Sequence, residues 1–355
     1  MRGWVMFLIG LWLGGGGLRA DYEVTRLLRS NNRALRERGA HRALWVWEAG
    51  VVRNRSQART LLNFCLQRGV DWLFVAVPWL PQGDHGSWRL FLADAHREGI
   101  EVFALAEAAP GLEAPSWVQQ HLKQIREYQE QVNPGEWFDG IVYDLTLALQ
   151  RLGLLGLKAV PLPGGGAAKA PKEGGPPPPV FTEEQIEGLR KMVELLRRAQ
   201  REMEGFRRPL RLLVPSSAHA LRLGAVVPEG LQGEVALDQT RKPFPQHLAE
   251  VADFLVFRAF ADEAGKIQEA VRDLLAYANL QGKRVLVGVN TDRLNLFPLE
   301  ATFFDEDQKR MEQELEEVIR NLQGEPAFGG VAIHHWASYL SLPEDRFQEG
   351  RLRPR

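Results

Sequence analysis

The chain has 355 residues, with 44 lysines and arginines against 45 aspartates and glutamates, and its formal net charge is −1. This balance, without a basic stripe interleaved with aromatic residues, argues against nucleic acid as a partner. The single cysteine, Cys65, excludes an intramolecular disulfide and is expected to pack in the core.

Residues 1–20 have the pattern of a secretory signal peptide. Arg2 supplies the positive start, Trp4 to Leu13 the apolar core, and cleavage is expected after Ala20. The mature chain would then lie in an extracellular or periplasmic space. An uncleaved N-terminal anchor is the alternative, but the apolar core is short for a spanning helix, so no membrane span is expected in the mature chain.

Beyond residue 40, short apolar runs alternate with longer amphipathic runs, which is typical of parallel strands joined by helices. Strands are expected at residues 43–49, 72–78, 101–108, 138–146, 210–216, 253–260, 284–291 and 329–336. Helices are expected at residues 57–68, 87–98, 118–132, 183–204, 266–280 and 305–322, with a short one at 247–252. Eight such units favour a single-domain (β/α)8 TIM barrel over residues 21–355, rather than an open doubly wound sheet.

A stretch rich in proline and glycine, residues 159–180, interrupts the predicted barrel after its fourth strand. Its composition does not suit a packed core, so we expect a flexible insertion at the carboxyl face of the barrel. The sequence leaves open whether it serves as a spacer or as a lid.

Polar side chains gather where the predicted strands end, and active sites of (β/α)8 barrels are built at those carboxyl ends. The candidates are Glu48, Glu107, Asp144, Arg258, Asn290, Asp292, His334 and His335. Asp144 stands out because a charge inside an apolar strand is costly unless it has a partner or a function. The set suits acid and base chemistry on a neutral polar substrate, or a network in which the groups satisfy one another.

Tryptophans are also frequent near the predicted strand ends, and flat aromatic rings suit the faces of sugars as well as they fill cores. Candidate platforms are Trp47, Trp79 and Trp336, of which the last two follow the final apolar residue of their strands. No glycine-rich phosphate motif follows the first strand, and no single element carries a metal-ligand spacing. We therefore expect no cofactor and no metal.

The fourth predicted strand, Asp139 to Thr146, resembles the Asp-Gly-x-Asp-x-Asp-x-Glu signature of chitinase-like glycoside hydrolases. Asp139, Gly140 and Asp144 match, whereas Val142 replaces the first lumenal aspartate and Thr146 replaces the glutamate that acts as proton donor in that family. The first, sixth and eighth strands also look like those of bacterial extracellular glycosidase-like barrels. The resemblance implies a (β/α)8 fold and an oligosaccharide or polysaccharide as partner.

Three interpretations remain open at this point. The first is a glycan-binding barrel that has lost the usual proton donor. The second is an active glycoside hydrolase that uses Asp144 with Glu48 or Glu107, with Glu107 as the preferred acid because alanines flank it. The third is a structural or interaction barrel of the cell envelope. The sequence does not indicate the sugar, its linkage or the oligomeric state.

Overall fold

In the computed structural model, the described residues are 23–77, 80, 85–107, 115–155, 181–213, 221–228, 231, 233–293 and 299–344. The expected signal peptide, Trp79 and the insertion at 159–180 lie outside these residues.

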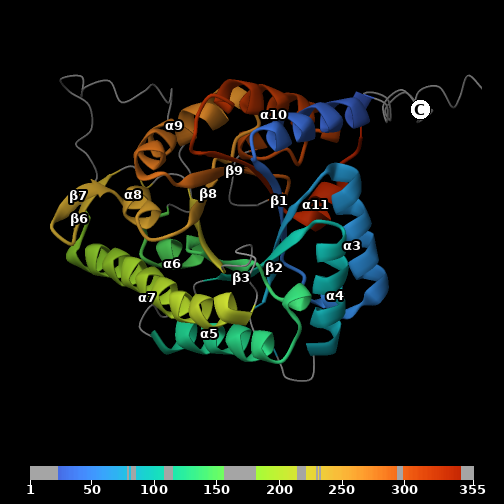
Figure 1. Ribbon diagram of the computed structural model, residues 1–355. Coiled ribbons are helices and arrows are strands. Elements are labelled where there is room, and N and C mark those ends of the chain that lie inside the picture. The colour runs from blue at the N-terminus through green and yellow to red at the C-terminus, as the bar shows by residue number, and fades with distance from the viewer. Residues whose placement is uncertain are drawn as a thin grey trace, which may run out of the picture.

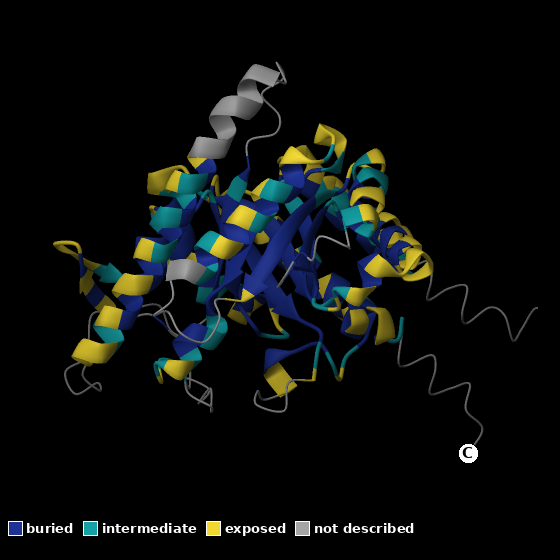
Figure 2. Cartoon of the chain, turned by 90° about the horizontal axis from the view of Figure 1, so that it is seen from below, coloured by how far each residue is buried: buried dark blue, intermediate teal, exposed yellow. Residues whose placement is uncertain are grey.

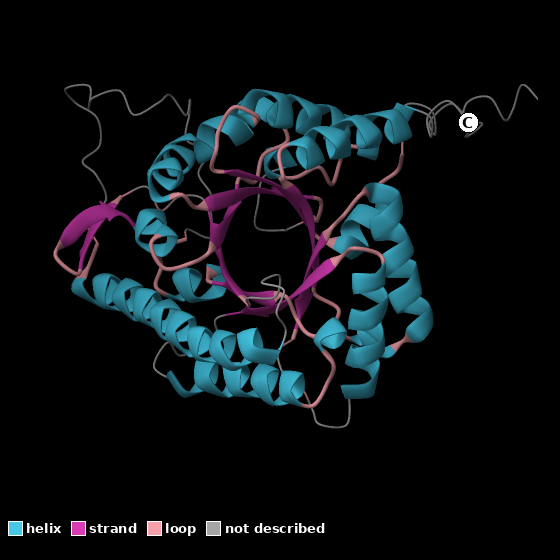
Figure 3. Cartoon of the chain, viewed as in Figure 1, coloured by secondary structure: helices cyan, strands magenta, loops and turns pink. Residues whose placement is uncertain are grey.

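Eight parallel strands close into a ring, which confirms the (β/α)8 barrel (Figure 3). They are β1 (His41–Val46), β2 (Trp72–Ala76), β3 (Glu101–Glu107), β4 (Gly140–Asp144), β5 (Arg222–Pro228), β8 (Phe254–Arg258), β9 (Arg284–Asn290) and β10 (Phe328–His334). Around the ring they follow the order β1-β10-β9-β8-β5-β4-β3-β2. The expected strands agree with the observed ones except for the fifth.

Helices surround the ring (Figure 1). They are α2 (Gly50–Arg53), α3 (Arg55–Arg68), α4 (His85–Arg97), α5 (Pro115–Glu130), α6 (Thr146–Arg151), α7 (Glu183–Leu213), α8 (Phe244–Ala249), α9 (Ala264–Gln281), α10 (Gln308–Leu322) and α11 (Trp336–Ser341). Residues 23–37 form a further helix, which the sequence analysis did not predict. None of the helices in the described part of the chain is both long enough and apolar enough to cross a bilayer.

The prediction of the fifth strand at residues 210–216 is wrong. Residues 210–213 end the long helix α7, and the strand that enters the barrel is β5, at residues 222–228. Gly224 makes this strand look weak in the sequence, yet the packing requires it, because a Cβ there would lie 2.5 Å from the ring of Phe254. The glycine interrupts the apolar run by which a strand is predicted, and it does so where the barrel has no room for a side chain.

A small antiparallel hairpin, β6 (Glu234–Leu237) and β7 (Thr240–Pro243), lies between β5 and α8. Its two turn residues, Asp238 and Gln239, have φ of 49° and 67°, as two-residue hairpin turns require. The short helix expected at residues 247–252 overlaps with α8, which starts three residues earlier because the hairpin leads directly into it.

Aromatic side chains fill the inside of the barrel. Trp45, Trp72, Phe74, Phe103 and Phe254 are all buried there and contact one another edge to face or at tilted angles. The interior is thus a packed core, and the dark blue of the strands seen from the side reflects this burial (Figure 2). Among the described residues, the polar side chains that face the lumen lie at the ends of the strands.

His121 is a buried histidine in the outer layer, between α5 and the barrel. Its Nε2 lies 3.0 Å from the carbonyl oxygen of Val77, its Nδ1 lies 3.3 Å from the hydroxyl of Tyr143, and its ring stacks on Trp117. Burial lowers the pKa of His121 to about 4, although the hydrogen bond to Val77 opposes the shift. His121 is therefore neutral in the folded protein near pH 7.

Lowering the pH should destabilise the folded protein because the fold keeps His121 neutral. Below pH 6.5 the unfolded chain protonates His121 whereas the folded chain does not, so its stabilising contribution is present above pH 6.5 and is lost as the pH falls toward 4. The loss amounts to about 3 kcal/mol. The free energy of unfolding is measured with urea at pH 7 and pH 4, for the parent and for His121→Gln. Its decrease between pH 7 and pH 4 should be about 3 kcal/mol smaller in the variant. Equal pH dependence in both proteins would contradict this assignment.

Candidate site at the carboxyl mouth of the barrel

Six of the predicted residues meet at the carboxyl mouth of the barrel. Glu107, Asp144, Arg258, Asn290 and His334 are the last residues of β3, β4, β8, β9 and β10, and Trp47 follows β1 directly. Each continues the series of alternate residues that fill the lumen, such as Leu105 before Glu107 and Val142 before Asp144. The strand register also pairs Glu107 with Asp144, and Asn290 with His334.

Asp144 and Arg258 form the deepest charged group of the mouth, with side chains only 3% and 10% exposed. Arg258 Nη1 lies 3.9 Å from Asp144 Oδ2 and donates a hydrogen bond of 2.8 Å to Thr146 Oγ1. Asp144 Oδ1 accepts a hydrogen bond from the backbone N–H of Thr146, whereas Oδ2 accepts none from the described residues. The arginine thus compensates the buried carboxylate but leaves one of its oxygens available.

Glu107 lies beside this group at the edge of the mouth, with its side chain reaching solvent. Partial burial and the neighbouring Asp144 carboxylate raise the pKa of Glu107, while Arg258 opposes the shift. The flanking alanines do not bury Glu107, and Asp144 is the more buried of the two carboxyls. Glu107 nevertheless holds its proton more tightly than an ordinary glutamate.

Trp47, His334 and Asn290 form a second group. The indole N–H of Trp47 donates to His334 Nε2 at 2.9 Å, and His334 Nδ1 lies 3.1 Å from Asn290 Oδ1. Because Nε2 accepts a hydrogen bond, Nδ1 must carry the proton and donate to Asn290. Burial, Arg258 and His335 lower the pKa of His334 well below its ordinary value, so this ring stays neutral and holds Trp47, which is half-buried.

Glu48, Asp292 and His335 form a third group at the rim. His335 Nδ1 lies 3.7 Å from Glu48 Oε1, and its Nε2 lies 3.6 Å from Asp292 Oδ2. Adjacent residues on a strand point to opposite faces, which would separate His334 from His335. The strand β10 ends at His334, so this alternation stops there, and the two imidazole rings lie 5.3 Å apart at the mouth.

Trp336 is not the exposed platform that its position suggested. It begins α11 and is only 8% exposed, in the core between barrel and helices. Two residues were not among the predicted site residues: Thr146, which accepts from Arg258, and Phe260, whose ring lies 4.3 Å below the guanidinium of Arg258. The spacing of Arg258 and Phe260, two residues apart at a strand end, was the signal that could have indicated this contact.

No protein-family model matches the sequence, and no curated protein matches it. Similar solved structures include the spore cortex-lytic enzyme SleL of Bacillus cereus, with 12% identity and a TM-score of 0.44, over 87% of this chain and 73% of that one. A chitinase from Bacteroides thetaiotaomicron has 7% identity and a TM-score of 0.46, over 84% and 90%. YKL-39, solved in the presence of chitooligosaccharides, has 10% identity and a TM-score of 0.46, over 88% and 98%.

Of these three solved structures, the one from Bacteroides thetaiotaomicron is of a chitinase. At such identities and scores, the likeness does not inform on substrate or activity. The assignment of the fold rests on the closed ring of eight parallel strands.

Proposed function

We propose that this protein is a secreted or envelope-associated glycosidase-like barrel that binds a glycan at the carboxyl mouth without cleaving it. One observation carries the proposal. The position of the family's proton-donor glutamate is held by Thr146, whose hydroxyl accepts a hydrogen bond from Arg258. A guanidinium stays protonated at any physiological pH and a threonine hydroxyl has no useful acidity, so neither group replaces the lost acid.

The remaining groups of the mouth suit sugar recognition. The half-buried ring of Trp47 is available for stacking against a sugar face, and its orientation is fixed by the neutral His334. Beside it, Asp144 Oδ2 accepts no hydrogen bond from the described residues, and a sugar hydroxyl is a suitable donor for a buried charged acceptor. The aromatic ring and the charged group together provide both the apolar and the polar part of a sugar-binding site.

Trp47→Ala should weaken glycan binding by about 30-fold, because removal of a central aromatic anchor typically costs about 2 kcal/mol. Binding is measured by calorimetry with an oligosaccharide selected on a glycan array. Trp117→Ala is the matched control, since Trp117 is also half-buried but stacks on His121 in the helix layer. Equal losses in the two variants would mean that the mouth is not the binding site.

An active glycoside hydrolase is the second candidate, and the pairing of Glu107 with Asp144 favours it. Their backbones lie on adjacent strands about 4.8 Å apart, a spacing that would allow the carboxyls to approach the separation of about 5–5.5 Å found in retaining glycosidases. The raised pKa of Glu107 suits an acid, and the buried Asp144 would serve as nucleophile.

This second candidate makes a different prediction for Glu107→Gln. If the barrel is a hydrolase, the substitution should lower sugar release by about 10²- to 10⁴-fold, the usual contribution of a general acid. If it only binds, the parent releases no reducing sugar at any pH, and Glu107→Gln retains glycan affinity within a few-fold. Glu101→Gln, on the same strand but at its amino end, is the control. A glycan array without any binder would favour a structural barrel instead.

A further inference from the structure

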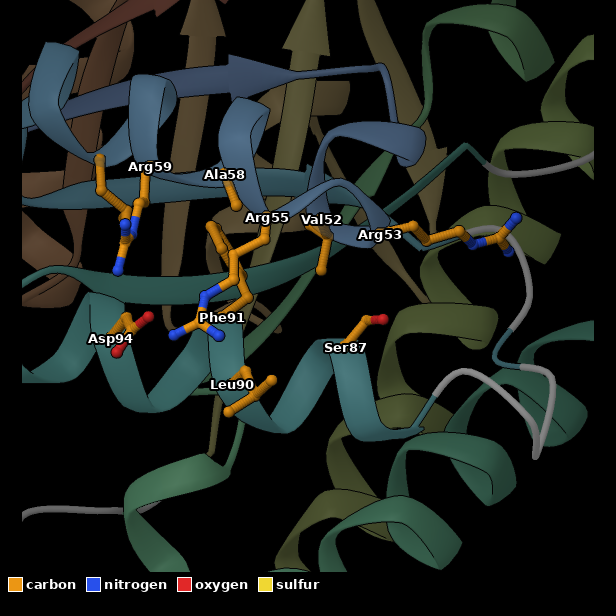
Figure 4. Close-up of a pocket in the computed structure, with 10 residues that line it drawn as sticks. Val52, Arg53, Arg55, Ala58, Arg59, Ser87, Leu90, Phe91 and Asp94 are labelled. Carbon is orange, nitrogen blue, oxygen red and sulfur yellow. The ribbon is translucent and has the colours of Figure 1, made fainter.

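A groove on the outer surface, between α3 and α4, has no part in the proposed glycan site. Its floor is apolar and includes Ala58, Leu62 and Phe91, and its volume open to water-sized groups is about 60 Å³. That volume holds about four to six water-sized spheres, which is room for a single small anionic group but not for a peptide helix. Figure 4 shows Arg55 and Arg59 extending from α3 toward α4 across this groove, and Arg53, the last residue of α2, also lines it.

In the part of the chain that the structure describes, the two arginines over the groove have no anionic partner. Arg55 and Arg59 make no hydrogen bond and no ion pair with any described residue. They are four residues apart on one helix, an arrangement of like charges that is unfavourable by itself. Asp94 also lines the groove, but its carboxylate is already paired with Arg97 at 2.7 Å. An anion placed between Arg55 and Arg59 would therefore relieve a repulsion that the described fold leaves uncompensated.

The sequence of this region has the same excess of positive charge. Residues 50–68 contain four arginines and neither aspartate nor glutamate, although the whole chain is close to neutral. Two of these four, Arg55 and Arg59, lie over the groove, whereas Arg68 forms an ion pair with Glu344 at 3.8 Å.

Two exposed leucines belong to this surface. Leu90 on α4 lines the groove and is 57% exposed. Leu66, further along α3 and outside the groove lining, is 47% exposed. Arg55, Arg59, Leu62 and Leu66 follow the i, i+4, i+7, i+11 spacing of one stripe on α3. A free phosphate or a sugar phosphate would use the arginines but not the leucines, whereas a lipid surface would use both.

We propose that the groove between α3 and α4 is a membrane-docking site that binds the phosphate of an anionic phospholipid. Arg55 and Arg59 contact the phosphate oxygens, and Leu90 and Leu66 enter the boundary between headgroups and acyl chains. This placement depends on the outer helices alone and does not depend on what the barrel mouth binds.

The first test is labelling of arginines with phenylglyoxal, read residue by residue by mass spectrometry on the full chain. Vesicles of phosphatidylglycerol and phosphatidylcholine should lower the labelling of Arg55 and Arg59 at least about fivefold. Labelling of Arg272 and Arg320, which are exposed on α9 and α10, should change less than twofold. Equal protection of both pairs, or no protection at all, would overturn the proposal, even if another segment of the chain binds vesicles.

Two further experiments identify the ligand. Glycerol phosphate at the same phosphate concentration, without vesicles, should give no protection; full protection by it would overturn the membrane source. R55A/R59A should weaken vesicle binding by about 30-fold relative to the parent, because each basic residue near an anionic surface contributes about fivefold. R272A/R320A removes the same charge and should bind as the parent does. Equal vesicle affinities for the two double variants would contradict the proposed site.

Discussion

Arg258→Met is expected to lower the free energy of unfolding by about 3 kcal/mol at pH 7. The arginine is the cation that compensates Asp144, and both side chains are at least nine-tenths buried. Removing one partner of a buried pair leaves an uncompensated charge, which is far more costly than the loss of the attraction itself. The change is measured by urea unfolding, with the same dependence of the unfolding free energy on urea concentration assumed for both proteins.

The companion variant is Arg258→Met/Asp144→Asn, which removes both charges. Most of the lost stability should return, because no uncompensated charge remains, while glycan binding should stay at least about tenfold weaker than in the parent. Recovery of stability together with parental glycan affinity would make the pair a structural network only. The double-mutant cycle therefore separates the glycan-binding interpretation from the structural one.

Glu312→Ala should have an even larger effect on stability, about 3–5 kcal/mol. Glu312 is fully buried on α10, where it forms an ion pair with Arg42 of β1. The hydroxyl of Tyr339 donates to it at 3.0 Å, and Asn31 Nδ2 donates to it at 3.0 Å. The network links the helix of residues 23–37, the barrel and two outer helices, so its loss leaves a buried guanidinium and loosens several elements together.

Thermal or urea unfolding of Glu312→Ala and of Glu317→Ala, an exposed position on the same helix, tests this expectation. The control should change stability by less than about 0.5 kcal/mol. A small effect at Glu312 would show that Arg42 finds another partner or enough water when the carboxylate is removed.

Most of the fold could be predicted because seven of the eight strands are continuous apolar runs followed by amphipathic helices. The fifth was missed because a glycine that the packing requires, Gly224, weakens the apparent strand, while an apolar stretch that ends α7 looks more strand-like. The hairpin of β6 and β7 depends on two non-glycine residues with positive φ, a conformation that residue type did not indicate.

For the candidate site, the sequence indicated which residues would lie at the carboxyl ends of the strands but not how they are arranged there. The rule that barrel function lies at carboxyl strand ends indicated Glu107, Asp144, Arg258, Asn290 and His334. Burial could not be predicted, because it depends on how helices cover each strand end: Trp336 starts a helix and is covered, whereas Trp47 remains half-buried at the mouth. The tautomer of His334 also depends on contacts between β1, β9 and β10, which no single segment contains.

The most direct test of the central claim is a glycan array with the purified chain, followed by a reducing-sugar assay on every glycan that binds. We predict binding without release of reducing sugar between pH 4 and pH 8, because our proposal places Thr146, which accepts a hydrogen bond from Arg258, where the chitinase-like signature has its proton donor. Release of sugar that is lost in Glu107→Gln would contradict the claim and establish a hydrolase that takes its acid from the third strand.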